Sequence, residues 1–258
     1  MSRPSTTATF SLPLGPESRW GLFLDLDGSL LDECSRPERV VAGTEVIRLL
    51  GALQQTFNGA LAIISGRPVR DIDRILYPLR LPCAGLHGAE RRSCDGTLTR
   101  LDVDQSALAQ VRAALNVISV KRCVELEDKE LGFAIHLRST PENVEAAEDS
   151  VTQVAERSRG AFRVLRGRKV IELIPNAAST LRAARAFMEE SVFSRRRPLM
   201  FAHHHADVNA FEVARERNGV AVAVGDAAPP TMHRVASPRE CRFLLSELVN
   251  LGHLGLVA

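Results

Sequence analysis

The stretch Phe23-Leu24-Asp25-Leu26-Asp27-Gly28-Ser29-Leu30 decides how the rest of the chain is interpreted. It begins inside an apolar run of strand length, and the side chains of Asp25 and Asp27 point to one face if the strand continues. Two carboxylates held this close repel each other unless a cation or a shared proton intervenes. The pair is therefore a candidate divalent-metal site with a nucleophile and a proton-transfer group. A turn that simply closes the strand is the alternative, and so short a motif does not exclude it.

The length and composition indicate an ordinary globular protein. The 258 residues suit one large domain or a core with a smaller companion, and 45% are hydrophobic and 25% charged. A net charge of +2 without a basic stripe predicts no nucleic-acid partner. Five cysteines without CxxC spacing argue against a disulfide framework and a thiolate zinc site. We expect no signal peptide, no membrane span and a cytoplasmic location.

Apolar runs and helical periodicity alternate along much of the chain. Strands are predicted at 20–25, 60–64 and 82–86, with helices at 43–55 and 69–76 between them. The alternation resumes later, with a helix, a strand, a helix, a strand and a terminal helix at 179–190, 198–202, 207–217, 219–224 and 242–251. This spacing predicts an α/β fold with a doubly wound, Rossmann-like parallel sheet. Ligands bind at the carboxyl ends of such strands, which is where the two aspartates lie.

A different pattern interrupts this alternation. It consists of a helix, two strands, a second helix and a hairpin, predicted at 104–118, 124–127, 132–138, 141–157 and 162–165 with 169–174. We predict an inserted α+β cap domain at 100–172 and a core domain formed by 19–99 and 173–258. Residues 1–18 have no periodicity, so we expect a flexible arm there.

Six motifs support a more specific interpretation. They are Asp25-Leu26-Asp27-Gly28-Ser29, Ser65-Gly66-Arg67-Pro68, Gly85-Leu86-His87-Gly88-Ala89-Glu90-Arg91, Glu125-Leu126-Glu127-Asp128-Lys129, Ala134-Ile135-His136-Leu137-Arg138 and Val170-Ile171-Glu172-Leu173-Ile174-Pro175. With these motifs, the chain resembles the haloacid dehalogenase superfamily of phosphotransferases. Within that superfamily it is similar to the trehalose-6-phosphate phosphatases. The resemblance covers nearly everything from Trp20 to Leu251.

The resemblance implies a reaction. Asp25 would attack phosphorus and form an aspartyl-phosphate, with Mg²⁺ as the cofactor. Asp27 would protonate the leaving sugar oxygen and then activate water. Ser65 and the backbone around Gly66 would hold the phosphoryl oxygens. An ordinary helix cap with a tight turn is the alternative for the serine and glycine.

The resemblance also implies a substrate, trehalose 6-phosphate, and residues that bind it. Glu127, Lys129 and Glu172 of the cap would contact sugar hydroxyls, because carboxylates accept hydrogen bonds and an ammonium donates them. The residues expected to contribute from the core are Gly66, Arg67, His87, Gly88 and Glu90. Of these, His87 and Glu90 would reach the substrate, and Arg67 would steady either the phosphate or the cap. Cross-strand ion pairs on a solvent-facing sheet are the alternative for the cap residues. We expect a monomer whose partner is this small sugar phosphate.

Two motifs depart from the family pattern. The family's lysine at the start of the helix after the cap is replaced by Thr180, which supplies no positive charge. His203 and His204 replace two aspartates of the metal motif, whereas Asp207 remains. The metal ligands implied by the resemblance are then Asp25, Asp27, His203 and Asp207. Imidazole in place of carboxylate suits a softer divalent ion than Mg²⁺.

Two functional hypotheses follow. The first is a trehalose-6-phosphate phosphatase that works through Asp25 and Asp27 at a reduced rate, with Ser65 and Thr180 in the catalytic site. Losing a charged transition-state contact commonly costs about 10²–10³ in rate. The second is a catalytically impaired relative that binds trehalose 6-phosphate or a protein partner in a regulatory role. Metal-dependent and Asp25-dependent release of phosphate discriminates between them.

Overall fold

A computed structural model describes residues 19–32, 39–137, 140–167, 170–203, 210–225 and 233–253. The arm predicted at 1–18 lies outside these residues, as do His204, Asp207 and the start of the helix predicted at 207–217. None of the helices within the described ranges has the length and apolar character that crossing a membrane requires.

The strand β1 (Trp20–Asp25) lies in the middle of a largely parallel sheet. Over the described residues this sheet has eight strands, in the order β12-β11-β10-β1-β2-β3-β4-β5. Their bounds are β2 Leu61–Ile64, β3 Cys83–Gly85, β4 Glu90–Arg92, β5 Leu98–Arg100, β10 Arg197–Ala202, β11 Val220–Val224 and β12 His233–Val235. β1 pairs in parallel with β2 on one side and with β10 on the other. The α/β prediction with a doubly wound sheet is confirmed.

The sequence does not predict three of these strands. β4 and β5 extend the sheet beyond β3 in antiparallel fashion, and β12 adds a parallel strand at the other edge. Each has only 3 residues, so neither an apolar run nor an alternation stands out in it. The two antiparallel strands carry the chain from the first sheet toward the second.

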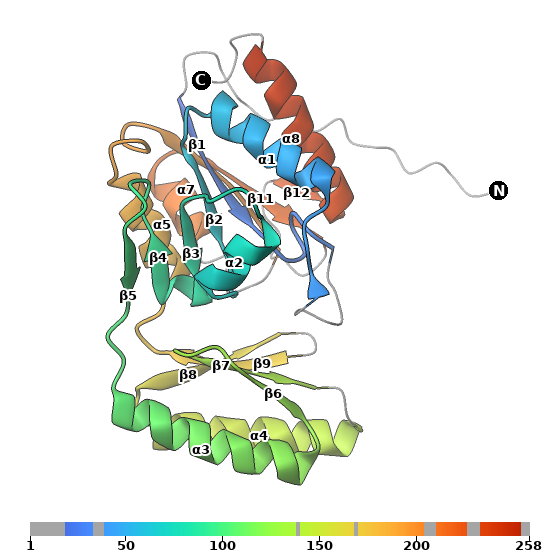
Figure 1. The fold of residues 1–258 in the computed structure, drawn as a ribbon, viewed down its shortest axis with the longest axis vertical. Coiled ribbons are helices and arrows are strands. Elements are labelled where there is room, and N and C mark those ends of the chain that lie inside the picture. Colours follow the sequence, from blue (N-terminus) through green and yellow to red (C-terminus); the bar gives the residue numbers. More distant parts are fainter. Residues whose placement is uncertain are drawn as a thin grey trace, which may run out of the picture.

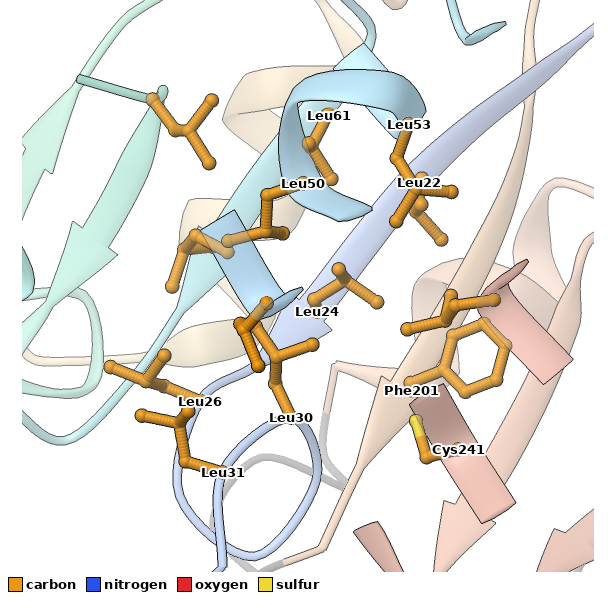
Figure 2. Close-up of a cluster of buried hydrophobic side chains, with 14 of the residues drawn as sticks. Leu22, Leu24, Leu26, Leu30, Leu31, Leu50, Leu53, Leu61, Phe201 and Cys241 are labelled. Atoms are coloured by element: carbon orange, nitrogen blue, oxygen red, sulfur yellow. The ribbon is translucent and has the colours of Figure 1, made fainter. Parts of the chain in front are cut away.

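Helices cover both faces of the eight-stranded sheet (Figure 1). α1 (Thr44–Thr56), α2 (Val69–Ile75) and α8 (Pro238–His253) pack on one face, and α5 (Thr180–Met188) and α7 (Phe211–Glu216) on the other. Leu22 and Leu24 of β1 point into the first layer, which Figure 2 shows, and Phe23 points into the second. A strand buried on both faces has a continuous apolar sequence, which is why β1 is recognisable.

A second, antiparallel sheet has the strand order β6-β7-β9-β8 within the part of the chain that is described. Its bounds are β6 Glu125–Asp128, β7 Phe133–His136, β8 Phe162–Arg166 and β9 Val170–Pro175. α3 (Gln105–Arg122) and α4 (Pro141–Arg157) cover one face, and the other is turned toward the first sheet (Figure 1). The predicted α+β unit is therefore present. The predicted boundary at 172 falls inside β9, and the division at 100 and 172 stays a prediction.

Candidate active site

Asp25 is the last residue of β1, and only 3% of its surface is exposed. Its Oδ1 accepts a hydrogen bond from the backbone N–H of Leu26 at 2.6 Å. Its Oδ2 accepts from the Ser29 hydroxyl at 3.0 Å and from the backbone N–H of His203 at 3.3 Å. These donors come from the turn after β1 and from the end of β10. Together they fix the direction of the carboxylate at the carboxyl edge of the sheet.

Asp27 lies beyond the end of β1, so strand alternation does not set the direction of its side chain. The guanidinium of Arg67 does, because Nε donates to Oδ2 at 2.6 Å and Nη2 donates to Oδ1 at 2.7 Å. Burial by itself would lower the pKa of Arg67. The hydrogen bond and charge of Asp27, with the charges of Asp71 and Glu127, outweigh burial and raise that pKa. Such a bidentate pair is among the stronger hydrogen-bonded contacts in proteins.

Ser65 follows β2 at the same edge of the sheet, since Ile64 is the parallel neighbour of Asp25. Ser65 is buried, and its Oγ accepts a hydrogen bond from the backbone N–H of Arg67 at 3.1 Å. Gly66 lies against the ring of His87, and a Cβ on this glycine would stand 2.7 Å from Nε2 of the histidine. A side chain at position 66 would therefore displace His87.

Three side chains join the two sheets. Nε2 of His87, in the turn Leu86–Gly88 after β3, lies 2.8 Å from Oε2 of Glu172 on β9. Lys129, which follows β6, donates to Oε1 of Glu172 at 2.6 Å and to the carbonyl of Gly66 at 3.3 Å. The structure thus brings Lys129 into contact with the loop that begins at Ser65, and Glu172 into contact with the turn that holds His87.

The contact that these three side chains make is ionic. Burial by itself would raise the pKa of the Glu172 carboxyl, but Lys129 and His87 outweigh it and hold that pKa well below its usual range. Burial works to lower the pKa of the Lys129 ammonium, and the charges of Glu172 and Glu127 more than offset it, so this pKa is raised. The ammonium and the carboxylate each stabilise the charged form of the other.

Glu127 lies on the same cross-strand line as Glu172. Glu127 is opposite Ala134, and Ala134 is opposite Glu172, so a small side chain separates the two carboxylates. Oε2 of Glu127 lies 3.0 Å from Nε2 of His136. Burial favours a higher pKa for Glu127, but the hydrogen bond to His136 and the charge of Lys129 lower it. Sequence reasoning assigned His136 no role. Its two-residue spacing from Ala134 nevertheless predicts that both side chains lie on one face of the sheet.

Glu90 and Gly88 connect the site to its surroundings. Glu90 begins β4 and is 2% exposed. Its Oε2 accepts from the backbone N–H of Val69 at 2.7 Å, and its Oε1 lies 3.0 Å from Nε of Arg100. Gly88 packs on the carbonyl of Ser179, which a Cβ at this glycine would approach to 2.5 Å. Both residues thus hold neighbouring elements at the edge of the sheet.

Thr180 is the first residue of α5, and 3% of its surface is exposed. The preceding Ser179 caps the helix, because its Oγ accepts from the backbone N–H of Arg182 at 3.2 Å. The start of α5 therefore offers a hydroxyl and backbone N–H groups, which suit an anion. The threonine adds no positive charge to them.

His203 follows β10 and packs on the turn after β1. Its Nδ1 lies 2.7 Å from the carbonyl oxygen of Val224, and because a carbonyl only accepts, Nδ1 is the donor. A Cβ on Gly28 would stand 2.3 Å from Cδ2 and 3.0 Å from Nε2 of this ring. The Nε2 edge of His203 therefore faces the backbone of Gly28, close to Asp25.

The family model described as trehalose-phosphatase matches residues 23–258 of the chain. The chain belongs to the trehalose-phosphatase family. Trehalose-6-phosphate phosphatase of Escherichia coli strain K12 is 31% identical over 223 residues, which cover 85% of this chain and 82% of that protein. A probable trehalose-phosphate phosphatase of Sinorhizobium fredii is 29% identical over 235 residues, covering 90% and 88%.

Solved structures of the trehalose-phosphatase family and its superfamily share the fold. The C-terminal domain of C. albicans trehalose-6-phosphate phosphatase has a TM-score of 0.77 at 17% identity, covering 91% of this chain and 93% of that one. A haloacid dehalogenase-like hydrolase from Bacteroides thetaiotaomicron has a TM-score of 0.64 at 14% identity, covering 90% and 100%. The predicted trehalose-phosphatase family, a family of hydrolases, is confirmed, and its fold is shared with the haloacid dehalogenase superfamily. Membership implies a sugar-phosphate substrate.

Phosphatases of this superfamily typically use Mg²⁺, but the described residues do not form an oxygen cage for it. Among the residues that the structure describes, no cluster of three or more His, Cys, Asp and Glu side chains is placed to hold a metal. Both side-chain oxygens of Asp27 accept hydrogen bonds from a guanidinium, and His203 offers nitrogen, which Mg²⁺ does not prefer. Asp207, the remaining predicted ligand, lies outside the described residues.

Proposed function

We propose that this protein hydrolyses trehalose 6-phosphate to trehalose and inorganic phosphate, at a reduced rate. The supporting observation is that the ammonium of Lys129 donates both to Glu172 and to the carbonyl of Gly66. A single residue thereby joins side chains suited to sugar hydroxyls to the loop beside Asp25. A phosphorylated sugar suits this arrangement, because its hydroxyls would meet the side chains of the second sheet and its phosphoryl group would meet the loop beside Asp25. Relatives named trehalose-6-phosphate phosphatases support the choice of sugar.

The proposed reaction has two steps. A carboxylate oxygen of Asp25 attacks phosphorus while the bond from phosphorus to the sugar oxygen breaks, and that oxygen takes a proton from Asp27. Water then attacks the aspartyl-phosphate and gives a proton to Asp27, so inorganic phosphate leaves and both residues return to their starting state. The burial of Asp25 and the hydrogen bonds that it accepts from Leu26, Ser29 and His203 support its assignment as the oriented nucleophile.

The remaining residues hold the substrate. Ser65, the backbone of Gly66 and the hydroxyl of Thr180 would donate hydrogen bonds to the phosphoryl oxygens. The residues proposed to bind the sugar phosphate are Glu127, Lys129 and Glu172 from the second sheet, and Arg67, His87, Gly88 and Glu90 from the first. We also propose a cap at 100–172, inserted in a core of 19–99 and 173–258. The protein would act as a cytoplasmic monomer without a nucleic-acid partner.

The ligands proposed for a divalent metal are Asp25, Asp27, His203 and Asp207. Mg²⁺ is the ion that family membership favours. A divalent ion would add positive charge beside the phosphoryl oxygens. The hydrogen bond from Nδ1 of His203 to a backbone carbonyl is the arrangement that metal-binding histidines adopt, and it favours a softer ion. His204 would strengthen that preference.

A catalytically impaired relative that binds trehalose 6-phosphate or a protein partner is the second candidate. The uncharged Thr180 at the start of α5 favours it. A missing charged contact in the transition state commonly costs about 10²–10³ in rate. The imidazole of His203, which packs on the Gly28 turn after Asp25, favours the same candidate, because it stands where the family pattern has a carboxylate.

Release of inorganic phosphate from trehalose 6-phosphate, measured with Mg²⁺, Mn²⁺, Co²⁺ and Zn²⁺, tests the proposal. We expect release that Asp25→Asn abolishes. Asp32→Asn is the matched control, because its side chain is 75% exposed and lies 3.5 Å from Arg242. If no metal supports Asp25-dependent release, the hydrolase is excluded and calorimetric binding of trehalose 6-phosphate tests the second candidate. Turnover with a softer ion that His203→Ala abolishes would assign this histidine as a ligand.

A further inference from the structure

The pair formed by Arg67 and Asp27 lies at the edge where the phosphoryl group binds in the proposed function. Two parallel hydrogen bonds of 2.6 and 2.7 Å join the guanidinium to the carboxylate. The side chains are 11% and 25% exposed, so the pair is largely screened from water but within reach of a ligand. A guanidinium fork matches phosphate oxygens in the same bidentate geometry. The carboxylate of Asp27 is therefore bound to a guanidinium that a phosphate group could bind in the same way.

The phosphoryl group needs that cation. A phosphate monoester brings negative charge to Asp25, itself a carboxylate, and like charges this close repel. Thr180 supplies no positive charge, and the ammonium of Lys129 lies 2.6 Å from Glu172 in the second sheet. Arg67 belongs to the loop that begins with Ser65, whose Oγ accepts from its backbone N–H. Within the described part of the site, Arg67 is thus the cation best placed for the phosphoryl group.

We propose that Arg67 exchanges anions: Asp27 binds its guanidinium in the substrate-free protein, and the phosphoryl group of the substrate displaces Asp27. The exchange rests on the proposed function, since it assigns Arg67 to the phosphoryl group rather than to the sugar. It also releases the Asp27 carboxylate, which then takes up a proton from solvent and can pass that proton to the leaving sugar oxygen. Substrate binding and the release of Asp27 are then one event.

The backbone of Arg67 is anchored, so the exchange requires rotation of its side chain alone. Its N–H donates to Ser65 at 3.1 Å, and its carbonyl accepts from the N–H of Leu86 at 2.9 Å. The preceding carbonyl, that of Gly66, accepts from Lys129. The loop can thus keep its place between the two sheets while the guanidinium changes partner.

Calorimetric titration with inorganic phosphate tests the exchange in four proteins: wild type, Arg67→Gln, Asp27→Asn and the double variant. We expect Asp27→Asn to bind phosphate about tenfold more tightly, because Arg67 loses its resident anion. Removal of a negative charge would by itself also tighten phosphate binding. The test is therefore the coupling between the two substitutions, that is, whether the effect of Arg67→Gln depends on the residue at position 27. In the Asp27→Asn background, Arg67→Gln should weaken binding about tenfold, and in the wild type by much less. Additive effects of the two substitutions would overturn the exchange.

Two further variants keep this experiment interpretable. Arg74→Gln is the matched control, because Arg74 lies on α2, is 41% exposed and bonds the carbonyl of Val40, so phosphate affinity should stay within about twofold. Arg67→Lys keeps the charge without the fork and should retain part of the coupling if Arg67→Gln folds poorly. The hydrolase and the exchange can fail separately: phosphate release with additive binding overturns only the exchange. Coupled binding without release overturns only the hydrolase.

Discussion

Nε2 of His87 lies 2.8 Å from Oε2 of Glu172, so a turn of the eight-stranded sheet and a strand of the second sheet meet in one hydrogen bond. Lys129 donates to the other oxygen of the same carboxylate at 2.6 Å. Glu172 is therefore bound by residues of both parts of the molecule in one buried ionic contact. Its side chain is 14% exposed, so water screens these interactions weakly.

Glu172→Gln should lower the free energy of unfolding at neutral pH by about 3 kcal/mol, because the buried ammonium of Lys129 loses its counter-charge. The folded-state pKa of Glu172 lies below its usual 4.5, so its contribution is present above that value and lost as the pH falls below it. Urea denaturation at about pH 7 and about pH 3 should show the stability difference shrinking in acid. Glu247→Gln, at an exposed position on α8, should show no such difference.

Lys129→Gln should raise the KM for trehalose 6-phosphate about tenfold or more. The ammonium, held between Glu172 and the Gly66 carbonyl, would donate to a sugar hydroxyl, and a hydrogen bond to a charged group is worth about 1.5–3 kcal/mol. Steady-state phosphate release at varied substrate concentration measures the change. Lys121→Gln, at the exposed end of α3, is the control and should leave KM unchanged. An unchanged KM in Lys129→Gln would contradict a sugar-binding role.

Gly28→Ala should destabilise the protein by about 1–3 kcal/mol and abolish phosphate release, because it forces His203 away from the turn. The glycine has φ +76°, and a Cβ would stand 2.3 Å from Cδ2 of the histidine. Thermal unfolding checks the stability. Gly51→Ala provides the contrast, since it lies within α1 with nothing within 4 Å of a Cβ, and should stabilise by about 0.5–1 kcal/mol. An equal response of both glycines would argue against the close packing of His203.

Thr180→Lys restores a positive charge at the start of α5, which by itself would be worth about 10²-fold in rate. We nevertheless expect Mg²⁺-dependent phosphate release by this single variant to stay well below that gain. The reason is that the side chain of His203, which packs on the Gly28 turn after Asp25, still has nitrogen where Mg²⁺ prefers oxygen. Comparing Thr180→Lys with Thr180→Lys/His203→Asp in the same assay separates the two defects. Full recovery by the lysine alone would show that His203 does not limit the reaction.

Local patterns predicted most of the fold. The run at Leu61–Ile64 and the helix at Thr44–Thr56 were predicted to within a few residues, because each is long enough to show its period. The strands β4, β5 and β12 were missed, since each has 3 residues of which at most one is apolar. The candidate site residues were predicted from motifs, and their roles stay proposals. His136 lies in one of the quoted motifs but was given no role, because alternation places it on a face without saying what it contacts.

The sequence by itself determined which side chains stand at the edge of the sheet: the carboxylate of Asp25, the uncharged Thr180 and the imidazole of His203. The positions of these three side chains follow from the residue types and from where the strands and the helix begin or end, and both are local properties of the sequence. Only the tertiary structure decided their partners. Asp27 and Arg67 are 40 residues apart, and His87 and Glu172 are 85 apart, yet each pair is hydrogen-bonded. Such pairs depend on how the sheets pack against each other, and packing between distant segments has no period in the sequence.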